Sequence, residues 1–349
     1  MVDYWRGWSG CSAPPAAPEH RCGILGAMRA VQVARLDGPS GVDVVDVPEP
    51  ERGEREVLVD VHALGISWPD LLQTRGEYQL KPELPFQLGV DFAGVVREAP
   101  DGSGFGPGDR VACCLPYGGG AEVVALDQES VFPLPDALSF EQGAALPMNY
   151  LTAQFALATR GQLGKGETVL VHGAAGGVGT ATLQVAKGYG ARTIAVVSTE
   201  EKAAVARGAG ADEAVLVDGF LEATKRLTGG AGVDVVVDVV GGDLMTDSLR
   251  ALAPQGRLLV VGFTAGAIPQ VKVNRLLLNN IDVRGVGWGA FAMVRRGFMR
   301  GQWNELLPMM TSGTIAPPIG RTYPLDDVRA ALVDMDERRT LGKSVVRLR

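Results

Sequence analysis

The sequence contains few of the residues that cross-link small proteins or bind metals. Only 4 cysteines and 3 histidines occur among 349 residues, which excludes a disulfide-stapled scaffold. Cys113 and Cys114 are adjacent in an apolar run, and this favours buried free thiols in a reducing compartment. The histidines, His20, His62 and His172, have no close-spaced ligand partners.

Long apolar runs and excess positive charge are also absent. No stretch reaches the roughly 18 apolar residues of a membrane span, and residues 1–27 lack the basic start and apolar run of a secretory signal. Because 33 Lys and Arg face 40 Asp and Glu, the net charge is −7, and no basic surface is indicated for nucleic acid or membrane. We therefore expect a cytoplasmic protein that acts on a small molecule.

Length and glycine content indicate a two-domain α/β protein. At about 150 residues per domain, 349 residues predict two domains with separate cores. The 47 glycines are about twice the average usage of roughly 7%, which is typical of the tight turns of dinucleotide-binding proteins.

The N-terminal half predicts an extension followed by a β-rich module. Residues 1–27 are rich in Ala, Pro, Ser and Gly without periodicity, so we expect a disordered or loosely docked extension. From Met28 the chain alternates, as in "MRAVQVARL" and "EVLVDVHAL", which indicates strands. Ser139 and Gln142 have the spacing of a capping box that opens a helical run to about Arg160.

Beyond Gly166 the pattern becomes a repeated strand–helix alternation. The six apolar strands are "TVLVH", "TIAVVS", "AVLV", "VDVVVDVV", "RLLVVGF" and "IDVRGVG", with helices between them, one over residues 243–256. This alternation predicts an α/β fold with a doubly wound parallel sheet buried on both faces. From about Met293 the chain is helical and then irregular, and we expect this tail to return to the first module.

A glycine-rich turn after the first of these strands carries the clearest chemical signal. It consists of Ala174, Ala175, Gly176, Gly177, Val178 and Gly179. Gly176 lets the backbone approach a pyrophosphate, Gly179 lets helix and strand pack closely, and the helix N-terminus supplies amide donors. Because the turn lies between a strand and a helix, it predicts a dinucleotide site rather than a tight turn alone.

The end of the next strand favours NADPH over NADH. Val197 and Ser198 stand where an NAD-specific enzyme places the acid that binds the ribose hydroxyls. Ser198, Thr199 and Lys202 leave room for a 2′-phosphate and a cation to pair with it. The alternative is that Lys202 is a solvated helix lysine, and two neighbouring glutamates weaken the phosphate interpretation.

Ordered motifs extend over nearly the whole chain after residue 27. They include "GISWPDLL", "RGEY", "GVDFAG", "GDRV", "LPMNYLTAQFAL", "VLVHGAAGGVG", "VDVVVDVVGG", "GRLLVVGF" and "GKSVVRLR". With these motifs the span 28–349 resembles the zinc-independent quinone oxidoreductase branch of the medium-chain dehydrogenase/reductase superfamily. The resemblance implies a GroES-like β-barrel catalytic domain of residues 28–150 and 293–349, and a Rossmann dinucleotide-binding domain of residues 151–292.

The resemblance also indicates that no metal is bound. Where zinc-dependent relatives place Cys, a His-Glu pair and a further Cys or Asp, this sequence has Ser67, Val90 with Asp91, and Met148. A hydroxyl, a valine and a thioether cannot build a tetrahedral zinc site, and the four-cysteine structural lobe is missing. His172, at the end of a strand, is interpreted as a packed, hydrogen-bonded histidine.

Without a Lewis acid, the enzyme suits acceptors that conjugation already activates, such as quinones and α,β-unsaturated carbonyls. Tyr78 matches the tyrosine that enoyl-reducing relatives use as a proton donor, and its alternative role is to cover the cleft. A second tyrosine of some relatives is Leu72 here. Ser67 and Asp70 flank the same cleft by resemblance, although Asp70 is more readily explained as a cap of the local turn.

The remaining coenzyme contacts are implied by the resemblance alone. Asn149 and Thr152 would approach the nicotinamide side, and Lys343 would reach the coenzyme from the returning tail. The ends of later strands would add Gly241 and Gly242, Phe263 and Thr264, and Trp288 and Gly289. The apolar strand "IDVRGVGW" is expected to pair with its copy in a homodimer, as in relatives, because a bare edge promotes aggregation.

Three functions follow from these observations. The first is an NADPH-dependent reductase of quinones or related conjugated carbonyls. The second is an enoyl-thioester reductase in which Tyr78 protonates the carbon next to the carbonyl. The third is a coenzyme-binding protein with a structural or regulatory role and little catalysis.

Overall fold

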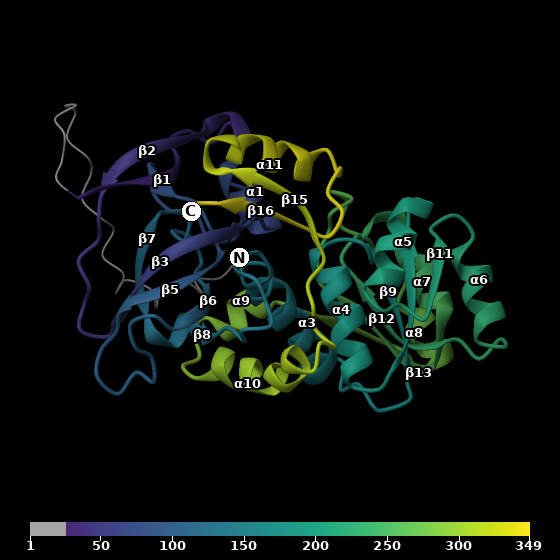
Figure 1. Ribbon diagram of the computed structural model, residues 1–349. Helices are drawn as coiled ribbons and strands as arrows, with labels where there is room; N and C mark the ends of the chain where they lie inside the picture. Colours follow the sequence, from purple (N-terminus) through teal and green to yellow (C-terminus); the bar gives the residue numbers. More distant parts are fainter. Residues whose placement is uncertain (1–25) are drawn as a thin grey trace. The chain divides into compact units, whose positions relative to one another are not determined.

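The structure, a computed structural model, describes residues 26–349, so the predicted extension lies outside it except for its last two positions. The chain divides into two compact units (Figure 1). The first consists of residues 26–148, Gly289–Trp303 and Ile319–Arg349, and the second of Asn149–Trp288 and Asn304–Pro318. The tail that we assigned to the first module is therefore divided, because Asn304–Pro318 groups with the second unit.

The first unit is built mainly from antiparallel strands. A seven-stranded sheet has the order β15-β16-β3-β5-β6-β8, with β7 paired to β3, and a smaller sheet has the order β2-β1-β4. The strands are β1 (Ala27–Val33), β2 (Val42–Pro48), β3 (Glu56–Gly65), β4 (Phe86–Gln87), β5 (Asp91–Glu98), β6 (Arg110–Cys114), β7 (Val123–Asp127), β8 (Val131–Pro133), β15 (Ile319–Pro324) and β16 (Lys343–Arg347). Alternating Val and Leu side chains from these strands bury a common apolar core, as the sequence pattern predicted.

The tail returns to this sheet through its last strands. β16 pairs antiparallel with β3 and parallel with β15, so residues near position 345 lie beside residues near position 64. Short helices complete the unit: α1 (Trp68–Thr74), α2 (Phe140–Gly143), α9 (Trp288–Ala292), α10 (Phe298–Thr311) and α11 (Val328–Asp336), with turns η1 (Gly38–Gly41), η2 (Gln128–Ser130) and η6 (Leu325–Asp327). The first residue of α9 and the last eight of α10 belong to the second unit. Cys113 and Cys114 are buried free thiols, as expected.

The capping box at Ser139 is present. The Ser139 hydroxyl accepts the Gln142 N–H at 3.2 Å, and the Gln142 side chain accepts the Ser139 N–H at 3.0 Å. The helical run to Arg160 is also present but not as one α-helix. It consists of α2, the π-helical turn η3 (Pro147–Leu151), α3 (Thr152–Gln154) and a second π-helical turn, η4 (Phe155–Arg160). Pro147 cannot donate a backbone hydrogen bond, which separates α2 from the later turns.

The second unit contains the six-stranded parallel sheet that the sequence predicted. Its order is β11-β10-β9-β12-β13-β14, formed by Glu213–Leu216, Arg192–Val197, Thr168–His172, Val233–Asp238, Leu252–Val260 and Asp282–Gly285. The helices between them are α4 (Gly177–Gly188), α5 (Glu200–Gly208), α6 (Phe220–Leu227), α7 (Met245–Ala251) and α8 (Asn274–Asn279). The strand order reverses between β9 and β12, and ligands of such sheets bind at the carboxyl ends of strands at this point.

The helix predicted over residues 243–256 is shorter than expected, and this prediction was wrong at its C-terminal end. A 3-10 turn, η5 (Gly242–Leu244), precedes α7, which ends at Ala251, and β13 begins at Leu252. Pro254 explains the difference, because proline removes a helical donor and disfavours helical geometry in the residue before it. Over residues 26–349 no helix is long and apolar enough to cross a bilayer.

Candidate active site

The glycine-rich turn of the second unit joins β9 to α4 and shapes a backbone surface. A Cβ built on Gly179 would collide with the carbonyl oxygen of Gly173, so only glycine fits this helix–strand contact. A Cβ on Gly176 would meet only the Gly173 oxygen, at 3.4 Å, which leaves the space beside Gly176 open. The first amides of α4 have no acceptor within the helix, and the positive end of its dipole favours an anion. The turn therefore fits a pyrophosphate group.

The other residues of the turn and its neighbours support this surface. Ala174 and Ala175 are buried beneath it, and Val178 is in the first turn of α4. Asn149 lies against the turn, since a Cβ on Gly177 would be 2.6 Å from Asn149 Nδ2. Asn149 and Thr152 are both nearly buried, and they come from η3 and α3.

The carboxyl end of β10 carries hydroxyls and a cation instead of a carboxylate. Lys202 Nζ donates to Ser198 Oγ at 3.2 Å on the exposed surface. Thr199 Oγ1 accepts the Lys202 N–H at 3.2 Å and caps α5. The nearby Glu200 is 3.9 Å from Arg207, which offsets its charge. This arrangement fits a phosphate ester better than a ribose diol.

The loops after β12 and β13 meet beside one another. Asp238 Oδ1 accepts the N–H groups of Val240 and Gly241 at 2.8 and 2.9 Å, which holds the first loop. Gly241 and Gly242 both have positive φ, at 70° and 63°, a region that favours glycine. A Cβ on Gly241 would lie 2.9 Å from the half-exposed Phe263 ring. Thr264 follows, with its N–H donated to Val239. These four predicted contact residues therefore lie at one edge of the sheet.

His172 has the structural role that we expected. Its ring is fully buried and hydrogen bonds through Nε2 to Ser248 Oγ at 2.8 Å. Burial lowers the pKa of His172 to about 4, against the opposing effect of the Asp238 charge. The ring is therefore neutral at physiological pH.

A buried polar network occupies the first unit. Ser67 Oγ donates to Asp91 Oδ2 at 2.7 Å, and Lys343 Nζ donates to Asp91 Oδ2 at 2.8 Å and to Ser67 Oγ at 2.5 Å. The Met148 N–H donates to Asp91 Oδ1 at 2.8 Å. All three network side chains are less than 5% exposed. Lys343, which we expected to reach a coenzyme, has its ammonium on Asp91 and Ser67.

This network does not fit a zinc ion. The Ser67 hydroxyl and the Asp91 carboxylate are both bonded to the Lys343 ammonium, and Met148 reaches Asp91 through its backbone N–H. A cation already occupies the place where a zinc ion would need free ligands. In the part of the chain that the structure describes, no group of three His, Cys, Asp or Glu side chains is placed to hold a metal. Sequence reasoning noted Asp91 but missed it as a site residue. The signal was a lone carboxylate within the apolar strand "GVDFAGVV".

Asp70 and Tyr78 lie close to this network. Asp70 Oδ2 accepts the Ser67 N–H at 2.8 Å and forms the capping box of α1, as the local-cap interpretation predicted. Burial raises the pKa of Asp70 to about 7, against the Ser67 amide and the Lys343 charge, and the Asp91 charge raises it further. Burial, with contributions from Cys114 and Asp70, raises the pKa of Tyr78 to about 12.

The tyrosine hydroxyl faces the start of α9. A Cβ built on Gly289 would lie 3.8 Å from Tyr78 Oη, so the two predicted site residues are neighbours in the first unit. Trp288, the residue before Gly289, is almost completely buried.

Each of the two units matches a known protein family. Residues 53–136 match the family model "Alcohol dehydrogenase GroES-like domain", and residues 177–312 match "Zinc-binding dehydrogenase". The bovine (Bos taurus) "Quinone oxidoreductase-like protein 2" is 37% identical over 325 residues, which cover 92% of this chain and 93% of that protein. The chain belongs to the medium-chain dehydrogenase/reductase family.

Solved structures of this family show the same fold. A probable oxidoreductase from Mycobacterium abscessus is 44% identical with a TM-score of 0.84, and the match covers 92% of this chain and 99% of that one. The quinone oxidoreductase of Thermus thermophilus, solved also as its complex with NADPH, is 36% identical with a TM-score of 0.79. That match covers 92% of this chain and 100% of the other. The GroES-like and Rossmann-type domains and the quinone oxidoreductase branch are thereby confirmed, and the chain is an enzyme of this branch.

The buried ion pair gives a prediction about stability. Lys343→Met leaves the Asp91 carboxylate buried without its cation, so the free energy of unfolding in urea should fall by about 3–5 kcal/mol. The double variant with Asp91→Asn should recover much of this loss, because no charge then remains unpaired. Lys225→Met, which removes an exposed partner of Glu222, is the control and should cost less than about 1 kcal/mol. Equal losses for the two lysine variants would contradict a buried pair.

Proposed function

We propose that this enzyme uses NADPH to reduce quinones or other conjugated carbonyl compounds by hydride transfer, without zinc. The observation that carries the proposal is the Ser67–Asp91–Lys343 network beside Asp70 and Tyr78. It supplies an ammonium, hydroxyls and a carboxylate in place of a metal-binding set. Such a site suits an acceptor whose own conjugation spreads the incoming negative charge. The Thermus relative, a quinone oxidoreductase whose complex with NADPH has been solved, supports the choice of acceptor and coenzyme.

The second unit would hold the coenzyme at the carboxyl edge of its sheet. The Gly176–Gly179 turn and the first amides of α4 would bind the pyrophosphate, and Ser198, Thr199 and Lys202 would bind the 2′-phosphate. The ribose and nicotinamide contacts would come from Asn149, Thr152, Gly241, Gly242, Phe263, Thr264, Trp288 and Gly289. When bound, the reduced nicotinamide supplies the hydride.

The first unit would receive the acceptor and supply its proton. Tyr78 carries the donor hydroxyl, while Ser67 and Asp70 fix the start of α1 through the capping box. Lys343 places a fixed positive charge behind Ser67. General acid catalysis by a positioned group typically contributes about 10²–10⁴-fold to a rate.

The cytoplasmic location expected from the sequence stays a prediction.

Coenzyme preference can be tested at Lys202. Lys202→Ala should weaken NADPH binding about 10- to 100-fold and leave NADH binding unchanged, because only NADPH carries the 2′-phosphate. Gly176→Ala should fold normally, because its Cβ has space. It should weaken the binding of both NADPH and NADH, because the added methyl group would block the pyrophosphate. Calorimetric titration gives both affinities, and Lys187→Ala, an exposed lysine at the far end of α4, is the control. Equal affinity of the unaltered enzyme for both coenzymes would refute the phosphate site.

The acceptor can be identified by NADPH oxidation with a panel of quinones, enones and enoyl-CoA esters. We expect turnover of quinones and enones, with Tyr78→Phe lowering kcat for the enones by about 10²-fold or more and leaving KM nearly unchanged. Selective turnover of an enoyl-CoA ester that needs Tyr78 would favour the enoyl-thioester reductase instead. Inactivity on the whole panel, despite stabilisation by NADPH, would favour a binding protein with little catalysis.

We also propose that the second unit forms a homodimer through its last strand. β14 pairs only with β13 among the described strands, which leaves one edge open. The preceding helix α8, which packs against β13, exposes Leu277 and Leu278, which are 76% and 74% exposed. An exposed apolar pair of side chains and an unpaired strand edge in one unit are both typical of an interface.

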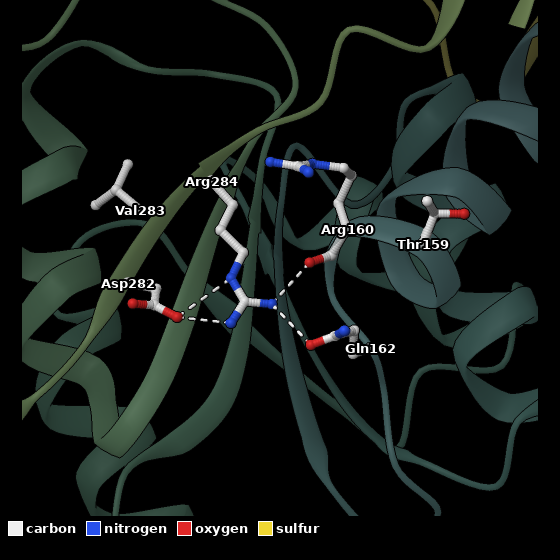
Figure 2. A pocket seen from close by; sticks show the side chains of 6 residues that line it. All are labelled: Thr159, Arg160, Gln162, Asp282, Val283 and Arg284. Atoms are coloured by element: carbon white, nitrogen blue, oxygen red, sulfur yellow. Dashed lines mark hydrogen bonds and ion pairs between the residues drawn. The ribbon is translucent and has the colours of Figure 1, made fainter. Parts of the chain in front are cut away.

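A hollow of about 310 Å³ lies along this edge strand (Figure 2). Arg284 crosses it and donates to Asp282 Oδ2 at 2.6 Å and to the Arg160 carbonyl at 2.8 Å. These bonds connect β14 to the end of η4 beside the strand edge that a second copy would pair with.

Dimer formation is tested by the double variant Leu277→Glu and Leu278→Glu. Charges on the exposed face of α8 should convert a dimer into a monomer, because the interface would bury them without partners. Light scattering after size-exclusion chromatography measures the mass, and Leu36→Glu, at an exposed leucine of the first unit, is the control. A monomeric unaltered protein would contradict the proposal.

A further inference from the structure

Two buried acceptor atoms on α1 lack a hydrogen-bond donor. Among the described residues, Asp70 Oδ1 and Gln73 Oε1 have no hydrogen-bond partner. The other side-chain atoms of both residues are satisfied: Asp70 Oδ2 accepts the Ser67 N–H, and Gln73 Nε2 donates to the Pro116 carbonyl at 2.8 Å. Residues three apart on a helix are neighbours on its surface. A buried acceptor without a donor is costly, and one proton on Asp70 would satisfy both atoms.

The charges around Asp70 also favour its protonated form. Two fully buried carboxylates, Asp70 and Asp91, have one ammonium nearby, that of Lys343, and it donates to Asp91 and to Ser67. At the end of α1, Arg75 pairs with Asp336 of α11 at 2.5 Å. An ionised Asp70 would therefore be a buried charge without a dedicated cation, which is strongly disfavoured.

The remaining groups that face Asp70 do not supply that cation. They are the Asp91 carboxylate on β5, the Cys114 thiol on β6, the Tyr78 phenol, and the backbone amides of Ser67 and Gly89. The Gly89 amide also lies near the Asp70 carboxyl and favours its ionised form. The two amides and Lys343 favour the ionised form, but burial and Asp91 outweigh them.

We propose that Asp70 carries a proton up to neutral pH, donates it in a hydrogen bond to Gln73 Oε1, and serves as a positioning residue that keeps the surroundings of Tyr78 uncharged while Tyr78 delivers its own proton. The catalytic part of this inference rests on the function proposed above. The protonation of Asp70 does not.

The proton balance shows why the charge of Asp70 matters. A hydride from the reduced nicotinamide dinucleotide brings two electrons to the conjugated acceptor, which becomes an anion. The Tyr78 O–H bond breaks, its proton goes to that anion, and a phenolate remains until solvent returns a proton. An ionised Asp70 raises the pKa of Tyr78 and opposes the phenolate, whereas a protonated Asp70 does not. Because the pKa of Asp70 is about 7, proton delivery should slow as the pH rises above it.

Asp70→Asn is the matched test variant. Its carboxamide keeps both hydrogen bonds, because the oxygen accepts the Ser67 N–H and the NH₂ group donates to Gln73. With an enone acceptor, kcat of the unaltered enzyme should fall as the pH rises through about 7 and then level off at a lower value, whereas kcat of the variant should not change over this range. Asp101→Asn, at an exposed carboxylate, is the control and should keep the original profile. The catalytic part of the inference would be overturned if kcat of Asp70→Asn fell with pH in the same way, or if kcat of the unaltered enzyme did not fall.

Infrared spectroscopy tests the protonation independently of turnover. The carbonyl band of a protonated carboxylic acid should be present at pH 6, absent at pH 9, and absent from Asp70→Asn at both. If the band is found but no acceptor is reduced, the proposed function fails and the protonation stands. If acceptors are reduced but the band is missing, this inference fails alone.

Stability provides a second measurement that needs no activity. The folded protein holds a proton on Asp70 between its usual pKa of 3.8 and about 7, and the unfolded chain does not. The contribution of Asp70 to stability is therefore full below pH about 4 and is lost as the pH rises to about 7. Compared with Asp70→Asn, the unaltered protein should lose stability over this range, and parallel curves would overturn the protonation.

Discussion

The first unit depends on the ion pair between Asp91 and Lys343. The two residues are 252 positions apart, yet their side chains lie 2.8 Å from each other with almost no exposure to water. A buried charge without its partner is strongly unfavourable, so β16 must pair with β3 to bring the Lys343 ammonium to the Asp91 carboxylate of β5. The same pair orients Ser67, whose backbone begins α1. One electrostatic constraint therefore connects the chain terminus, the sheet and the helix that carries the site.

The second unit is organised by a steric constraint instead. Gly179 brings α4 so close to the Gly173 carbonyl that no larger residue fits, and this contact fixes the helix N-terminus at the carboxyl end of β9. The adjacent strands β10 and β12 end at the same edge, so their following loops meet there. In a parallel sheet with this strand order the backbone alone forms a binding edge, whatever side chains the loops carry.

Local patterns explain what the sequence predicted well. Six β-branched apolar runs, the turn after β9 and the Ser139 capping box depend on residues a few positions apart, and all are present. The Asp91–Lys343 pair depends on long-range pairing that periodicity cannot reveal. Pro254 is a local signal for the end of α7 at Ala251. The placement of Asn304–Pro318 with the second unit carried no local signal.

The chemistry of the site follows from the hydrogen bonds that its charged groups already make with one another. The Lys343 ammonium is bonded to Asp91 and Ser67, so it offers an acceptor a fixed electrostatic field rather than the open coordination position of a Lewis acid. Such a field stabilises a negative charge that is already spread over a conjugated system more readily than it activates an isolated carbonyl. The second carboxylate, Asp70, would cancel this field if it were ionised. A protonated Asp70 therefore keeps the net charge of the buried cluster at zero and preserves whatever the lysine contributes.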